Sequence, residues 1–219
     1  MSIYWIIFIG TAIASWIVQS SLQSKFKKYS KVPLPYGMTG ADVARKMLYD
    51  NGITDVQVTH TPGHLTDHYN PQTKTVNLSE SVYHSCSIAA AAVAAHECGH
   101  AIQHAIGYLP LKIRSTIVPV TNLGAKLSMP LIMLGILFSY ASKYFIWVAY
   151  AGVACFGLCA LFQLITLPTE YNASRRAIRS LESCMRLSDD EIVGSKKVLN
   201  AAALTYVAAL TVTVMQLLR

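Results

Sequence analysis

The residues best suited to chemistry lie in the stretch AAHECGHAIQHA, residues 94–105, which holds three histidines four positions apart and one glutamate. Residues four apart share a face of a helix, so His96 and His100 can direct ring nitrogens at one metal ion. His104 lies about 12 Å along a helix from His96 and cannot join that pair. Glu97 completes the pattern H-E-x-x-H, in which the carboxylate reaches water on the metal. We predict His96 and His100 as zinc ligands, Glu97 as general base, and His104 as a packing or supporting residue.

A zinc ion held by two histidines needs a third protein ligand, because catalytic sites use three and leave the fourth position to water. The metzincin motif would place a histidine ten residues after His96, where the chain has Ile106, so that class is excluded. The remaining common solution is a glutamate on a later helix. The segment TLPTEYNASRRAIRSLE, residues 166–182, predicts a helix start at Pro168 and offers Glu170. Glu170 is either the third ligand or an acid favoured at a helix N-terminus by the dipole.

Long apolar runs place much of the chain in a membrane. Apolar residues make up 53% of the chain and charged residues only 13%, whereas about 25% of residues in soluble domains are charged. Residues 3–22 can cross the bilayer, and lysines follow this run instead of preceding it, which favours a retained anchor over a cleaved signal peptide. Three later runs are further candidate spans, at 127–141, 144–167 and 198–218; the first of them is short or extends backwards through Lys126. We therefore expect a mainly α membrane protein with about four transmembrane helices.

Basic residues are distributed unevenly around these spans. Of the 18 lysines and arginines, ten lie between Lys25 and Lys126 and six between Arg175 and Lys197. Loops rich in Lys and Arg stay in the cytoplasm, so both segments are predicted to be cytoplasmic, with both termini outside. An even number of crossings then separates the histidines from the glutamate, as a shared site requires. The net charge of +7 is explained by this topology and by anionic lipid, so no nucleic-acid partner is expected.

This topology divides the chain into five predicted parts. They are a transmembrane anchor, a cytoplasmic α+β unit with the H-E-x-x-H helix, a transmembrane hairpin, a cytoplasmic helix with the third ligand, and a last transmembrane helix. Their bounds are 1–24, 25–126, 127–167, 168–197 and 198–219.

Residues 39–85 predict the first part of the α+β unit. Thr39 as N-cap, with Asp42 three residues later, begins a short amphipathic helix that Gly52 ends. The unit therefore opens with a helix whose apolar side needs a partner.

Strands are expected to follow this helix. Two alternating runs, ITDVQVT at 53–59 and KTVNLS at 74–79, predict strands, and YNPQT between them is rich in turn formers. The alanine-rich stretch 87–106 predicts the helix that carries the histidines. A strand just ahead of that helix either pairs with an extended peptide through its free edge or is only a strand of the fold.

Four blocks of the sequence together resemble the YugP-type family of bacterial membrane zinc metallopeptidases: LTDHYNPQTKTVNLSESVY, AAHECGHAIQH, LPTEYNASRRA and LNAAALTYVAAL. More distantly, EYNAS is similar to the E-x-x-A-D segment of gluzincins such as the HtpX-like and CaaX prenyl proteases. The resemblance implies a zincin-like α+β unit, with His96, His100 and Glu170 as ligands. It also implies Glu97 as the base. Ser174 stands where the distant relatives carry Asp, so the partner that orients a ligand histidine differs here.

The expected function is that of a membrane-bound zinc endopeptidase, in which water activated by Zn2+ loses its proton to Glu97 as it attacks the peptide bond. The site is expected at the cytoplasmic face of a bacterial cytoplasmic membrane. The expected partners are the lipid bilayer and a protein or peptide substrate, with membrane proteins as candidates. Donors for the developing oxyanion are to be sought among His64, His68, Tyr69, Tyr171 and Tyr206.

Two other classes of function remain open at this stage. One is an intramembrane protease of the site-2 type, in which the H-E-x-x-H helix itself crosses the bilayer. That topology would reverse the sidedness of everything after the helix, and the Leu-Asp-Gly ligand segment of that class is not present. The other is a non-enzymatic membrane scaffold stabilised by zinc, which has no use for Glu97.

Overall fold

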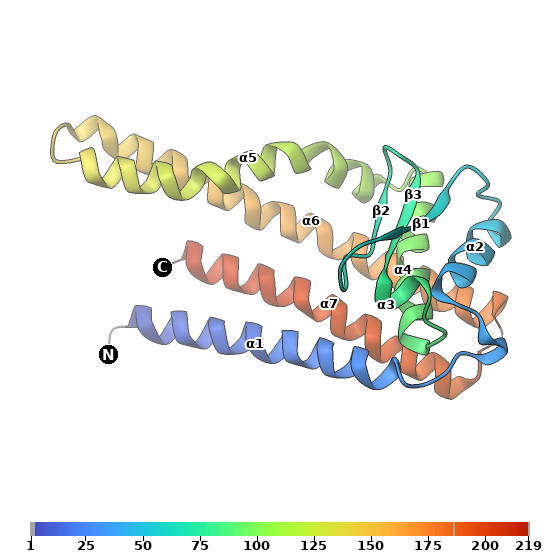
Figure 1. Cartoon of the computed structure of the whole chain (residues 1–219). Helices are drawn as coiled ribbons and strands as arrows, with labels where there is room; N and C mark the ends of the chain where they lie inside the picture. The colour runs from blue at the N-terminus through green and yellow to red at the C-terminus, as the bar shows by residue number, and fades with distance from the viewer. Residues whose placement is uncertain (1–2, 186, 219) are drawn as a thin grey trace.

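The computed structural model describes residues 3–185 and 187–218, which form mostly helices and one small sheet (Figure 1). The helices are α1 (Ile3–Tyr29), α2 (Gly40–Asp50), α3 (Glu80–Tyr83), α4 (Ile88–Ala105), α5 (Leu109–Phe138), α6 (Ile146–Cys184) and α7 (Asp189–Leu217). The strands are β1 (Gln57–Thr61), β2 (His68–Asn70) and β3 (Thr75–Ser79), and two 3₁₀ helices are η1 (Pro35–Gly37) and η2 (Lys143–Phe145). Helices α1, α5, α6 and α7 are long and apolar enough to cross a membrane, which confirms the expected four.

All four long helices extend beyond the predicted spans, and α1 continues to Tyr29. Helix α5 begins at Leu109, well ahead of residue 127, and α7 begins at Asp189, ahead of residue 198. Helix α6 continues through Pro168, so the predicted helix start at that residue is wrong. Proline removes one helix hydrogen bond, but apolar helices packed against neighbours tolerate that loss. Glu170 therefore lies inside a helix, and the helix dipole does not account for it.

The four long helices are arranged in a row. Helices α5 and α6 form a hairpin, α6 also packs against α7, and α7 packs against α1 (Figure 1). Small residues bring the hairpin helices close together. A Cβ atom at Gly135 would collide with the backbone of Ala149, and one at Gly152 would collide with the carbonyl group of Ser128. The hairpin is thus a tight pair that returns the chain to the end from which it started.

The α+β unit lies at that end of the row (Figure 1). Its helix α2 begins as predicted, since Thr39 and Asp42 form a reciprocal capping box. The sheet has the order β1-β3-β2, with β1 parallel and β2 antiparallel to β3. The first predicted strand, 53–59, is displaced to Gln57–Thr61, and β2 was not predicted at all. Strand β2 has three residues, too few for an alternating pattern, and it is held by pairing with β3 and by a contact with α4.

Helix α4 is surrounded by protein. It packs against α2, α6 and α7, and seven of its alanines are buried. Their small side chains let neighbouring helices approach closely. The closest approach is at Gly99, where an added Cβ would lie 2.6 Å from the carbonyl oxygen of Ala173 on α6. The helix that carries the histidines is therefore pressed against α6, and among the described helices it is not one of the candidate spans.

We expect Gly99→Ala to destabilise the protein. Crowding against α6 costs about 1–3 kcal/mol, which outweighs the gain of about 1 kcal/mol in helix propensity. The midpoint of thermal unfolding in detergent should fall by about 5 °C, and bound zinc should decrease with it. Gly10→Ala is the matched control, because nothing lies within 4 Å of a Cβ at that position. An equal or higher midpoint for Gly99→Ala would contradict the close packing.

Candidate active site

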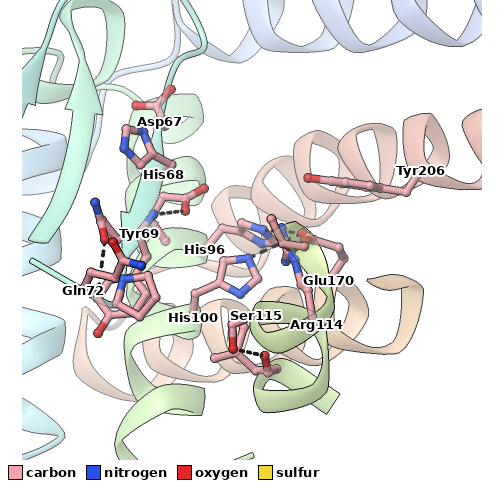
Figure 2. Close-up of a pocket in the computed structure, with 15 residues that line it drawn as sticks. Asp67, His68, Tyr69, Gln72, His96, His100, Arg114, Ser115, Glu170 and Tyr206 are labelled. Carbon is pink, nitrogen blue, oxygen red and sulfur yellow. Dashed lines mark hydrogen bonds and ion pairs between the residues drawn. The ribbon is translucent and has the colours of Figure 1, made fainter. Parts of the chain in front are cut away.

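Two helices bring three potential metal ligands to one point. Helix α4 presents His96 and His100 on one face, and α6 presents Glu170 opposite them (Figure 2). Glu170 Oε2 lies 3.1 Å from His96 Nε2 and 3.5 Å from His100 Nε2. One ligand atom from each of the three residues lies within 4.8 Å of the others. Glu170 is almost completely buried, and one oxygen of its carboxylate faces the two imidazoles.

These three residues fit a zinc ion. Ligand atoms about 2.1 Å from one zinc in tetrahedral arrangement are about 3.4 Å apart, close to the separations between Glu170 and the two rings. Two imidazole nitrogens and one carboxylate oxygen are a donor set that catalytic zinc uses, with one coordination position left over. His104 is not part of this group; its Nδ1 hydrogen-bonds the hydroxyl of Tyr69 at 2.7 Å.

Glu97 lies beside the three donors, and a hydrogen bond fixes its carboxylate. Its Oε2 accepts a hydrogen bond of 2.9 Å from the backbone N–H of Tyr69 on β2. Burial raises the pKa of Glu97 to about 7; the nearby His96 acts against this shift and the Glu170 carboxylate adds to it. The short strand that the sequence analysis missed is thus the element that holds this carboxylate.

A pocket of about 380 Å³ opens over these groups (Figure 2). His96, Glu97, His100 and Glu170 lie in its wall, so the donors are accessible to a ligand. One side of the pocket is formed by residues 67–72 on and around β2. The opposite side comes from α5 and α7, through Leu111, Arg114, Ser115, Val118 and Tyr206.

The comparisons with known proteins agree with a zinc site at these residues. A family described as "putative neutral zinc metallopeptidase" matches residues 4–219. The chain belongs to this metallopeptidase family. The "putative membrane protease YugP" of Bacillus subtilis strain 168 is 44% identical over 205 residues, which are 94% of this chain and 89% of that protein. No solved structure matches the chain. The resemblance to YugP-type proteins noted from the sequence is thereby confirmed.

The outer nitrogen of each histidine has its own partner. His96 Nδ1 lies 3.1 Å from Ser174 Oγ, and His100 Nδ1 lies 3.0 Å from Gln103 Oε1. When Nδ1 donates to such an oxygen, the lone pair is left on Nε2, which faces Glu170. The partner of His96 Nδ1 is thus a neutral hydroxyl.

Gln103 is fixed in turn by α6. Its Nε2 donates to the carbonyl oxygen of Thr169 at 2.8 Å and to Asn172 Oδ1 at 3.0 Å. The amide oxygen must therefore face His100, because both donor positions are occupied. Gln103 is fully buried and links the histidine helix to the helix of Glu170.

Arg114 on α5 is a part of the site that the sequence analysis did not identify. Its Nη1 donates to Glu170 Oε1 at 2.6 Å, so it occupies the carboxylate oxygen that faces away from the histidines. The sequence did contain one indication of this residue, a positive charge near the start of a long apolar helix. Charged residues in such helices usually pair with another group and belong to a functional site. Its function became visible only when α5 and α6 were seen to pair.

Three of the five suggested oxyanion donors line the pocket and two do not. Tyr69, His68 and Tyr206 line the pocket. The Tyr69 hydroxyl is occupied by His104, and His68 Nδ1 lies 2.8 Å from the carbonyl oxygen of Thr66. The other two do not line this pocket: His64 packs against the ring of Phe26, and Tyr171 is partly exposed elsewhere on α6. Tyr206 extends from α7 towards the side of the pocket where His96 lies (Figure 2).

We expect Gln103→Met to weaken zinc binding about 10–100-fold, because it leaves His100 Nδ1 without an acceptor. Competition with a fluorescent chelator measures this affinity in detergent. His104→Met is the matched control, since it removes a polar side chain from the same helix without touching a donor atom. Equal zinc affinity in both variants would show that Gln103 does not orient the ligand.

Proposed function

We propose that the chain is an integral membrane zinc endopeptidase, with zinc held by His96, His100 and Glu170 and with Glu97 as general base. The observation that carries the proposal is the convergence of three donor atoms within 4.8 Å in a pocket that Glu97 also lines. Membership of the zinc metallopeptidase family supports the metal and the type of reaction. The name of the related membrane protease supports the location.

Each residue of the site has its own role in the proposed reaction. When bound, zinc polarises the scissile carbonyl group and lowers the pKa of water to about 7. Glu97 takes the proton of the attacking water and passes it to the leaving amine. The Tyr69 N–H holds Oε2 of this carboxylate, and the other oxygen, which accepts no hydrogen bond from the described residues, is left to carry the proton. Arg114 holds Glu170 so that its Oε2 faces the histidines.

The substrate is proposed to lie beside β2 as an extended peptide. Strand β2 is at the edge of the sheet, and within the described part of the chain its one strand partner is β3. Residues on both sides of it line the pocket, opposite the wall formed by α5. An exposed strand edge binds a peptide through backbone hydrogen bonds, largely irrespective of its side chains; such pairing would use backbone groups around β2 other than the Tyr69 N–H, which donates to Glu97. This favours peptide contact over a purely structural role for the strand.

Helix lengths support a position for the site outside the hydrocarbon core, and the distribution of basic residues supports the cytoplasmic side. Helices α5, α6 and α7 contain 30, 39 and 29 residues, whereas about 20 residues cross the hydrocarbon core. Their surplus turns extend towards the α+β unit, and the α5–α6 connection lies at the opposite end (Figure 1). We propose that segments 25–126 and 168–197 are cytoplasmic, because they carry most of the positive charge.

The two other classes have less support. A site-2-type intramembrane protease needs the H-E-x-x-H helix to cross the bilayer, yet α4 packs against α2, α6 and α7 and is not one of the candidate spans among the described helices. A zinc-stabilised scaffold would use the three donors but not Glu97. The carboxylate of Glu97 lies at the pocket with a defined hydrogen bond, which favours a catalytic role.

We expect Glu97→Gln to reduce the rate of peptide cleavage about 10²–10⁴-fold while zinc content is retained. The variant should then trap peptides, which can be recovered with it and identified by mass spectrometry. Glu182→Gln makes the same change on the surface, where Glu182 pairs with Lys196, and should cleave at the normal rate. Full activity of Glu97→Gln would exclude the peptidase mechanism.

We expect a membrane-impermeant maleimide to distinguish the two ends of the molecule in intact cells. Cys86 is exposed on the α+β unit. In a variant that keeps Cys86 and has the other four cysteines replaced, Cys86 should be protected from the reagent. Tyr140→Cys, introduced into a cysteine-free background, should be labelled, because residue 140 is 96% exposed in the α5–α6 connection. Labelling of Cys86 without permeabilisation would overturn the cytoplasmic placement.

A further inference from the structure

A second, smaller cavity adjoins the candidate active site. It has a volume of about 170 Å³ and shares four lining residues with the larger pocket: Asp67, His96, Glu97 and Tyr206. The larger pocket opens between β2 and α5, whereas this cavity lies between α1 and α7. The two cavities therefore meet at the residues that flank the proposed cleavage position.

The walls of the smaller cavity are mainly apolar. Helix α1 contributes Leu22 and Phe26, α7 contributes Val198, Leu199 and Ala202, and Leu65 comes from the β1–β2 connection. An apolar cavity of about 150 Å³ is large enough to bind benzene. The cavity between α1 and α7 therefore matches a single large apolar side chain in size and in chemistry.

A charged side chain has little to pair with in this cavity. The acidic groups at its inner end are Asp67 and Glu97, and the described residues already engage both. Asp67 accepts hydrogen bonds from the backbone N–H and the hydroxyl of Ser79, and Glu97 Oε2 accepts the N–H of Tyr69. A lysine or arginine of a substrate would lose its hydration between apolar walls and would meet only the second oxygen of Glu97, which the proposed mechanism uses for the proton.

We propose that the cavity between α1 and α7 is the specificity pocket of the peptidase. It selects substrates with a large apolar side chain, such as Leu, Met or Phe, at one position next to the scissile bond. This inference rests on the proposed function. It also gives α1 a part in substrate recognition, because the last turns of this helix form one wall of the pocket beside the catalytic groups.

The test is a cleavage profile measured with a peptide mixture and mass spectrometry. The wild type should cut preferentially where Leu, Met or Phe occupies one flanking position. Ala202→Leu fills the pocket, so the ratio of the rates for a Phe peptide and its Ala counterpart should fall at least about 10-fold. Ala209→Leu, on the exposed side of the same helix, should leave that ratio unchanged. Bound zinc is measured in each variant, to show that the metal site is intact.

A second variant changes the pocket in the opposite direction. Leu22→Ala enlarges it from α1 and should raise the relative rate for a Trp peptide. Unchanged ratios in both variants, or a wild-type preference for charged residues, would overturn the specificity pocket and leave the proposed function standing. Absence of cleavage of every peptide by zinc-loaded wild type would instead overturn the proposed function, and the pocket with it.

Discussion

The site depends on one contact between two helices, the approach of Glu170 on α6 to the histidines of α4. Donor atoms must be within a few ångströms of each other to share an ion, and side chains of these sizes reach that far only if the backbones are close. Gly99 permits this closeness, because its missing side chain leaves room for the carbonyl oxygen of Ala173. A glycine between the two histidines is thus as much a part of the site as the ligands.

The membrane hairpin has a structural role in this arrangement. Residues His100 and Glu170 are 70 positions apart, and α5 and most of α6 lie between them. Because α5 and α6 pack tightly along each other, the chain returns to the level of α4. The same pairing brings Arg114 to Glu170, so the hairpin delivers both the carboxylate and the cation that fixes its orientation.

The two histidines proposed as ligands are held by neutral groups on their outer side. Ser174 and Gln103 hydrogen-bond the histidines, and Arg114 is the charged group that contacts the glutamate. Neutral acceptors keep the imidazoles in the required tautomer and do not add negative charge beside two buried carboxylates. This arrangement suits a site in which Glu97 is already deprived of solvent and its pKa is raised.

The sequence predicted the elements with strong local patterns. Four apolar runs indicated the long helices, Thr39 and Asp42 marked the start of α2, and H-E-x-x-H selected His96 over His104. These features depend on residues that are near each other in the chain. The prediction was wrong at Pro168, because proline is a local signal for a helix start and packing overrides it within an apolar helix.

The amino-acid sequence alone therefore determined the type of chemistry and the class of fold. Which side chains support the site was decided only by the tertiary structure. Strand β2, Gln103 and Arg114 have no local pattern that reveals their roles, because each acts through a partner many residues away. The pocket between α1 and α7 is likewise formed by the two ends of the chain. Hydrogen bonds and cavities depend on distances in space, and those distances exist only after the helices have packed.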